Sequence, residues 1–345
     1  MHYLGVKTKL LDWIFLNIQR HANTLGLASD SVFLDACTGT GSVACRAERE
    51  GFQVVANDLL AAPAHVVRGK LGISPTRLPE IRELLFQMNA LPPVEGHFYR
   101  EYSPAGGRMY LTEGNALMVD AARDFIRTVP DPNLQSYLYY CLLEALSKVL
   151  NTTGMQGAYL KSWQGNSTIP ISFPECPIYG KGMAQIFNLD VVDLLGASEF
   201  RKGGGKEHIL YIDPPYVSRE YAPNYHVYEA AVSPVDPTVR GKTGLPETYV
   251  RSEFCGKVET VEDFLVQVLQ RTWAQLVVIS YSSDSTVPLH RLTAAMIQGG
   301  CTQVEVQVMP YQRYKSDSDE DRNHKQDLLQ EFLVLGHRES TLEMF

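Results

Sequence analysis

The sequence predicts an α/β protein with a mostly parallel sheet, an inserted helical lobe and a C-terminal antiparallel hairpin. Short apolar runs alternate with helical patterns near both ends of the chain, which favours parallel strands joined by helices. Between about residues 64 and 187, amphipathic segments are separated by loops rich in proline and glycine. We therefore expect a sheet domain from residues 1–63 and 188–345, interrupted by a helical lobe at 64–187.

The first elements form a helix followed by two strand-containing units. A helix is expected over residues 7–21, where apolar side chains fall on one face: Leu10, Leu11, Ile14, Phe15 and Ile18. The run SVFL is typical of a strand ending at Leu34, and a helical stretch begins at Val43 after a glycine turn. A second short strand, FQVVAN, ends just before Asp58.

The remaining elements divide between the lobe and the sheet. Helical periodicity in the lobe appears in IRELLFQMNAL, GNALMVDAARDFIRTV and LQSYLYYCLLEALSKVL. The sheet pattern returns with VVDLL, HILYI and LVVIS, which we interpret as strands. VEVQVM and LLQEFLVLGH are expected to pair as the antiparallel hairpin, and the charged run between them is typical of a solvated loop.

The glycine turn has the pattern of a ligand-binding loop. Gly39 and Gly41 lie between a strand and a helix, where glycine lets a ligand approach the backbone and the helix N-terminus attracts negative charge. The third glycine of a dinucleotide fingerprint is missing, which disfavours NAD or FAD. Asp58 follows the next strand, where an acidic residue binds ribose hydroxyls, although a turn or helix-cap aspartate fits this position equally well.

The most informative motif is Asp213-Pro214-Pro215-Tyr216, which follows the apolar run HILYI. The Asp is therefore expected just past the carboxyl end of a strand, where open α/β sheets bind ligands. Two prolines fix an extended backbone, which directs the Asp213 carboxylate and the Pro214 carbonyl toward one planar amino group. Tyr216 offers a flat face for stacking. This arrangement suggests methyl transfer to an amino group.

Composition predicts a soluble protein in a reducing, cytoplasmic compartment. The chain has no apolar run long enough to cross a bilayer and no secretory leader. Its six cysteines form no CxxC pair and no metal-ligand cluster, so we expect reduced thiols and no metal. The net charge of −8 does not favour binding to a polyanion such as nucleic acid. Positive charge is concentrated in EFRKGGGKEH and around Arg240 and Lys242, which form either a basic stripe or ordinary solvated loops.

Four ordered segments resemble the Dam-like class of adenine-N6 DNA methyltransferases, most closely those of FokI-type restriction-modification systems. They are YLGVKTKLLDWI, FLDACTGTGSVA, YIDPPYVSREYAPNYHVYE and RGKTG, and weaker similarity extends almost end to end. The resemblance implies a Rossmann-like S-adenosylmethionine-dependent methyltransferase fold, with the donor site before the catalytic motif. It also implies double-stranded DNA as substrate, a base flipped out of the duplex, and a cognate restriction endonuclease or an orphan or phage setting.

The resemblance also implies roles for individual residues. Asp213, Pro214, Pro215 and Tyr216 would be catalytic. The donor would contact Tyr3, Gly5, Lys7, Asp35, Thr38, Gly39, Gly41, Asp58 and Asp190, although a helix N-cap is the alternative for Asp190. The substrate would contact Ser218, Arg219, Tyr221, Tyr225, Arg240 and Lys242. The lobe at 64–187 is the first candidate for target recognition, and the loop at 232–257 is the second.

Two other functions are compatible with these residues. Related acceptor arrangements methylate RNA or the amide of a protein, and a non-catalytic nucleic-acid-binding relative would keep the same fold. An intact acceptor motif argues against the last, because a protein that only binds has no need for two acceptors on one amino group.

Overall fold

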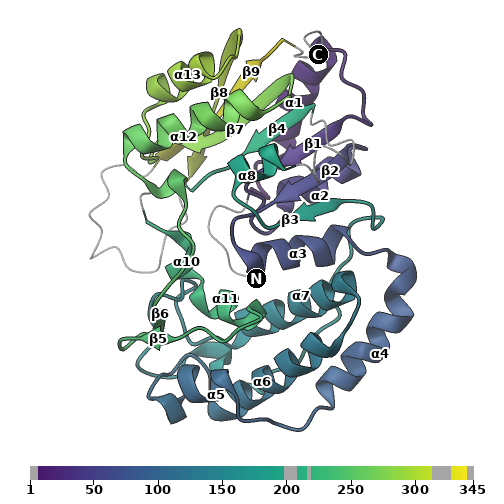
Figure 1. Cartoon of the computed structure of the whole chain (residues 1–345), viewed down its shortest axis with the longest axis vertical. Coiled ribbons are helices and arrows are strands. Elements are labelled where there is room, and N and C mark those ends of the chain that lie inside the picture. The colour runs from purple at the N-terminus through teal and green to yellow at the C-terminus, as the bar shows by residue number, and fades with distance from the viewer. Residues whose placement is uncertain (1–6, 198–207, 216–218, 313–327, 340–345) are drawn as a thin grey trace. The chain divides into compact units, whose positions relative to one another are not determined.

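The computed structural model describes residues 7–197, 208–215, 219–312 and 328–339 (Figure 1). The chain divides into two compact units, each assembled from three segments, and we describe each by itself. The helical unit contains Met1–Lys9, Thr38–Leu189 and Glu220–Arg251. The sheet unit contains Leu10–Cys37, Asp190–Arg219 and Ser252–Phe345.

The strands of the sheet unit follow the order β1-β4-β7-β9-β8. Parallel pairing joins β1 (Val32–Asp35), β4 (Ile209–Ile212) and β7 (Leu276–Ser282). Antiparallel pairing then joins β7 to β9 (Leu328–His337), and β9 to β8 (Gln303–Gln312). Every residue of β4 and β7 is buried, as expected for central strands with both faces covered. The expected α/β fold and its closing hairpin are confirmed.

Helices pack on this sheet through apolar faces. α1 (Leu11–Thr24) contacts β7, and its Phe15 ring stacks on Phe33 of β1 with ring centroids 5.9 Å apart. α12 (Val258–Arg271) packs against α13 (Leu289–Gln298) and against the short helix η4 (Glu253–Cys255), and α13 contacts β8; Figure 1 shows α12 and α13 beside the strands. The helix expected from residue 7 begins at Leu11, because residues 8–10 form a turn.

One predicted strand is wrong. VVDLL forms the helix α8 (Val191–Gly196), whose first turn is capped by the Asp190 side chain accepting a hydrogen bond from the Val192 N–H at 2.8 Å. The pattern of VVDLL alone fits either a strand or a helix. The Asp190 cap favours the helix. The nearby strand lies earlier, at β3 (Gln185–Phe187), and pairs in parallel with β2 (Gln53–Asn57) in the helical unit.

The helical unit contains the three helices predicted for the lobe: α4 (Leu78–Asn89), α6 (Glu113–Thr128) and α7 (Pro132–Val149). Thr112 caps α6, and Asp131 followed by Pro132 begins α7, both common N-terminal signals. The unit also includes α2 (Ser42–Arg49), α3 (Ala61–Leu71), α5 (His97–Tyr102), α10 (Tyr221–Asn224), α11 (His226–Val232) and three short 3₁₀ helices, η1 (Pro75–Arg77), η2 (Pro104–Gly106) and η3 (Gly165–Thr168). Besides the expected lobe at 64–187, the unit thus takes in residues 38–63 and 220–251.

α3 and α7 approach closely at a glycine. A Cβ atom on Gly69 of α3 would lie 2.9 Å from the Cβ of Tyr140 and 3.1 Å from the Cα of Tyr137, both on α7. Such distances are too short for any larger residue, so Gly69 sets how closely the two helices pack. Most of α7 is buried, and its tyrosine and leucine side chains form much of the core of this unit.

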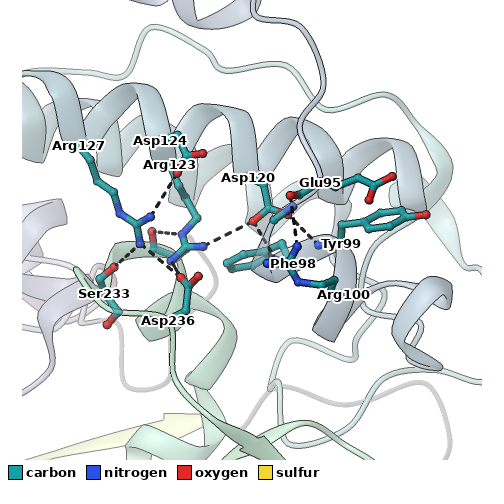
Figure 2. A network of polar contacts seen from close by, with 12 residues as sticks. Glu95, Phe98, Tyr99, Arg100, Asp120, Arg123, Asp124, Arg127, Ser233 and Asp236 are labelled. Carbon is teal, nitrogen blue, oxygen red and sulfur yellow. Dashed lines mark hydrogen bonds and ion pairs between the residues drawn. The ribbon is translucent and has the colours of Figure 1, made fainter.

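An ionic network centred on the buried pair Asp120 and Arg123 ties α6 to α11 and to the partly exposed Asp236 that follows it (Figure 2). Asp120 accepts hydrogen bonds from the N–H groups of Gly96, Phe98 and Tyr99 at the start of α5. Arg123, one turn along α6, lies over the Phe98 ring and donates to the Ala231 carbonyl and to Asp236 at 2.6 Å. These contacts join segments far apart in the sequence, which explains why residues 220–251 fold with the lobe.

Arg123 is therefore expected to stabilise the helical unit strongly. Arg123→Met keeps the size of the side chain but leaves the buried Asp120 carboxylate and the Ala231 carbonyl without this partner, which typically costs about 3–5 kcal/mol. The free energy of unfolding from urea titration measures this loss. Arg82→Met is the control, because its ion pair with Glu175 is exposed and should contribute little. Equal losses in the two variants would contradict this account.

Candidate functional site

The glycine loop in the helical unit has the backbone geometry that glycine provides. Gly39 and Gly41 have φ values of 51° and 79°, in the left-handed region that other residues adopt with strain. The loop is held by hydrogen bonds from the Thr38 N–H to the Asn57 carbonyl and from the Gly41 N–H to the Thr38 carbonyl. A Cβ atom on Gly41 would lie 2.7 Å from Val67 of α3, so this glycine is also required for helix packing.

Asp58 connects this loop to the end of β2. One carboxylate oxygen accepts a hydrogen bond from the Gly39 N–H at 2.8 Å, and the other accepts from the Leu60 N–H at 2.9 Å. Burial raises the pKa of Asp58 to about 6, although both N–H donors oppose this shift. The structure thus brings Thr38, Gly39 and Gly41 together with Asp58. Each oxygen keeps a second acceptor position, so the turn contact leaves ribose binding open.

Residues that the sequence analysis missed hold this loop from two sides. The Asn57 side chain bonds both the N–H and the carbonyl of Leu189, while the Asn188 amide donates to the carbonyls of Asp58 and Leu59. From α3, Lys70 Nζ donates to the Thr40 carbonyl at 2.8 Å. Single asparagines and lysines carry no spacing signature, and only the adjacency of Asn57 to Asp58 pointed to this region.

In the sheet unit, Asp35 and Asp213 lie at the carboxyl ends of adjacent parallel strands. Asp35 is the last residue of β1 and is in register with Tyr211 of β4, two residues before Asp213. Burial, followed by the nearby Asp213 carboxylate and then by Asp35, raises the pKa of the Tyr211 hydroxyl well above its usual value. Both carboxylates therefore lie near the Tyr211 side chain. Pro214 is buried, whereas Asp213 and Pro215 are half-buried.

Asp190 is the N-cap of α8, which is the alternative considered from the sequence. Burial raises its pKa, and the backbone N–H groups of α8 oppose this shift. Its contact with the donor stays a prediction. Lys7, at the start of the described chain, is buried in the helical unit. Four predicted site residues lie outside the described residues: Tyr3, Gly5, Tyr216 and Ser218.

The segment after the DPPY motif supplies aromatic side chains to the helical unit. The ring centroid of Tyr221 lies 6.1 Å from that of Tyr225, and Tyr225 stacks in parallel on Tyr228 at 6.3 Å. Tyr225 is 1% exposed, whereas Tyr221 is half-buried. His226 is also buried, with Nε2 donating to the Gln156 carbonyl at 2.8 Å, and burial lowers its pKa to about 4. His226 is therefore a neutral, packed histidine.

Arg240 and Lys242 lie on a tight hairpin formed by β5 (Val239–Arg240) and β6 (Leu245–Pro246). The turn is fixed to the helical unit, because Arg108 donates to the Gly241 carbonyl at 3.0 Å and the Tyr110 hydroxyl donates to the Thr243 carbonyl at 2.9 Å. Both cationic side chains are exposed, as is Arg219 in the sheet unit. The hairpin thus presents two cations on an anchored backbone.

Two further features bear on the kind of site. No group of three or more His, Cys, Asp or Glu side chains in the described ranges is arranged to hold a metal ion. Of the helices described, none is long and apolar enough to span a membrane. Residues 199–207 of the basic run EFRKGGGKEH lie outside the described residues, which include only its final residue, His208.

Sequence comparisons identify the family. The family model for D12 class N6 adenine-specific DNA methyltransferases matches residues 3–293. The chain is 32% identical over 342 residues to the type II methyltransferase M.NlaIII of Neisseria lactamica, covering 96% of this chain and 98% of that protein. It is 32% identical to M.CviAII of Paramecium bursaria Chlorella virus 1 over 321 residues, covering 91% and 92%. M.FokI of Planomicrobium okeanokoites is 29% identical, covering 95% of this chain and 50% of that protein.

The match includes both the glycine loop and the DPPY motif, and it confirms the resemblance inferred from the sequence. It also favours DNA over RNA or a protein amide, and an enzyme over a module that only binds. This chain belongs to the D12 class of N6 adenine-specific DNA methyltransferases.

Proposed function

We propose that this protein transfers a methyl group from S-adenosylmethionine to the N6 amino group of an adenine flipped out of duplex DNA. The observation that carries the proposal is the position of Asp213, at the carboxyl end of β4 and beside the end of β1, in a chain of this family. Ligands of open α/β sheets bind at this edge, so a substrate amine there can meet both Asp213 and the carbonyl of Pro214.

The acceptor pair explains how a poor nucleophile reacts. The lone pair of the adenine amino nitrogen is delocalised into the ring, which weakens attack. Asp213 and the Pro214 carbonyl accept the two N–H groups, favour a more pyramidal nitrogen and direct its lone pair toward the methyl carbon. When bound, S-adenosylmethionine supplies a methyl group on an electrophilic sulfonium. Positioning by the protein therefore carries most of the catalysis.

The residues around the glycine loop fit such a donor. Each Asp58 oxygen can accept two hydrogen bonds and accepts only one from a backbone N–H group. Each oxygen can therefore accept a second hydrogen bond, from a ribose hydroxyl. The N-terminus of α2 favours the carboxylate of an amino acid. We assign Tyr3, Gly5 and Lys7 to the segment that closes over the donor, and Asp35, Thr38 and Asp190 to its remaining contacts.

DNA binding requires local positive charge on an acidic protein. Arg240 and Lys242 meet this need, because their hairpin is held by Arg108 and Tyr110 and both side chains are exposed. Tyr216 would stack on the flipped base, with Ser218 and Arg219 nearby in the chain. Tyr221, on α10, is better exposed than Tyr225, which lies between α10 and α11, and the buried Tyr225 would act by supporting it.

The relatives suggest a setting. M.NlaIII and M.CviAII are named type II methyltransferases, and enzymes of that type protect DNA from a restriction endonuclease. We infer that this protein serves the same purpose in the cytoplasm, with a cognate endonuclease or as an orphan or phage enzyme. The segments at 64–187 and 232–257 would read the target sequence.

The product of the reaction tests the proposed function most directly. The protein is incubated with tritiated S-adenosylmethionine and duplex DNA, RNA or protein, and labelled nucleosides are separated after digestion. We expect N6-methyladenine from duplex DNA alone. Label in RNA, in protein or on cytosine would contradict the proposal.

Substitution of Asp213 tests the acceptor pair. Asp213→Ala should abolish methyl transfer and leave donor affinity nearly unchanged, because the carboxylate contacts the substrate amine. Asp213→Asn should retain some activity, since the amide oxygen still accepts one hydrogen bond. Rates under single-turnover conditions and donor affinity by calorimetry measure these effects. An alanine variant as fast as the wild type would show that the acceptor pair is not used.

The raised pKa of Asp58 predicts how donor affinity depends on pH. Only the deprotonated carboxylate can accept both ribose hydroxyls in addition to the two backbone N–H groups, and its pKa of about 6 means that most of it is protonated at pH 5. Affinity for the donor should therefore fall about tenfold between pH 7 and pH 5. Asp58→Asn should bind weakly at both values, with a flatter profile. A wild-type affinity that is constant across this range would argue against ribose binding by Asp58.

A further inference from the structure

Glu229, a residue of α11, contacts the start of α3. Its carboxylate oxygens accept hydrogen bonds from the N–H groups of Ala61 at 3.0 Å and Ala62 at 2.9 Å. Burial, and then the neighbouring Asp58 carboxylate, raise the pKa of Glu229 to about 7, while the two N–H donors oppose this shift. Glu229 is thus electrostatically close to Asp58 as well as bonded to the helix that follows it.

Among the described residues, only Glu229 accepts hydrogen bonds from these two N–H groups at the start of α3. An α-helix begins with N–H groups that lack intrahelical acceptors, and a side chain at the N-cap usually satisfies one of them. Here the N-cap is Leu60, the first turn contains no acidic residue, and Pro63 has no N–H. The Ala64 N–H reaches the Leu60 carbonyl at 3.4 Å. Glu229 therefore provides from another helix the cap that α3 lacks in its own sequence.

α3 in turn touches the donor loop at three places. Its N-cap residue is Leu60, whose N–H donates a hydrogen bond to the Asp58 carboxylate. Val67 fills the space beside Gly41, and Lys70 donates to the Thr40 carbonyl. A displacement of α3 would consequently move Asp58 and the glycine loop together, because all these contacts lie along one short helix.

We propose that Glu229 is a positioning residue that holds the donor-binding loop in register with the segment after the DPPY motif, by capping α3 from α11. The inference rests on the proposed function, in which Asp58 and the glycine loop bind S-adenosylmethionine. Glu229 lies in the chain sixteen residues after Asp213 and touches neither reacting group, so its effect appears in donor binding.

The chain offers a matched control for this cap. Asp120 is a buried carboxylate on one helix that, like Glu229, accepts N–H groups at the start of another helix, here α5. α5 is not continuous with the donor loop, so Asp120→Asn should lower stability and leave donor affinity within about twofold of the wild type. A variant of Glu229 that acts only through stability would behave in the same way.

The experiment compares donor affinity and saturated rate in the full-length protein. Glu229→Ala should weaken S-adenosylmethionine binding about tenfold, the effect of a lost cap, while the rate at saturating donor stays within about threefold. Glu229→Gln should restore much of the affinity, because its amide oxygen accepts one of the two hydrogen bonds. Glu229→Asp keeps the charge, but its side chain is too short to reach both N–H groups of α3. The affinity of this variant for the donor should therefore be nearly as low as that of the alanine variant.

The outcomes separate a failure of the positioning role of Glu229 from a failure of the donor-site assignment. If Asp58→Ala loses donor affinity but the Glu229 variants keep it, the positioning role is overturned and the donor site stands. If Asp58→Ala binds donor normally, the donor site is misassigned and the inference falls with it. An affinity loss in Asp120→Asn equal to that in Glu229→Ala, at matched melting temperatures, would reduce Glu229 to a structural residue. Should Glu229→Ala fail to fold, the Gln and Asp variants supply the same comparison.

Discussion

The position of α3 is the constraint on which the glycine loop, our proposed donor site, depends. On one side, the helix packs against Gly41 through Val67, and on the other its Gly69 lies against Tyr140 of α7. Both contacts are closer than any side chain on either glycine would permit. The loop geometry is therefore fixed by packing in the helical core as well as by its own backbone. We expect a small-molecule site on this loop to be as rigid as the packed helices that hold it.

This rigidity suits the chemistry of the family. Methyl transfer to an amino group needs neither a covalent enzyme intermediate nor a metal, so the protein contributes mainly by holding two reactants in line. The carboxylates that we assign to the two reactants, Asp213 and Asp58, are half-buried and buried, and burial raises the pKa of Asp58, and of the positioning residue Glu229, toward neutrality. Asp58 and Glu229 each accept hydrogen bonds from backbone N–H groups of a turn or a helix, and these bonds oppose the rise in pKa.

Much of the fold and of the candidate site could be predicted from the sequence, where the signals are local. The DPPY motif, the glycine turn and the apolar strands are each contiguous, and the structure places Gly39 beside Asp58 as the order of strands implied. VVDLL was misinterpreted because a short apolar run fits either a strand or a helix until its cap is recognised. The role of Glu229 could not be predicted, since its partners are backbone N–H groups that leave no mark in the sequence. The inclusion of 220–251 in the helical unit likewise depends on distant contacts, such as Arg123 with Asp236.

We propose that the donor binds on a loop whose geometry α3 sets. Amide hydrogen exchange with and without S-adenosylmethionine tests it most directly, because exchange rates report the opening of individual hydrogen bonds. We expect the donor to slow exchange at Gly39 and Leu60, whose N–H groups donate to Asp58, and also at Ala61 and Ala62, whose N–H groups donate to Glu229. Saturating donor that leaves these four amides unchanged, while slowing exchange elsewhere, would contradict the account.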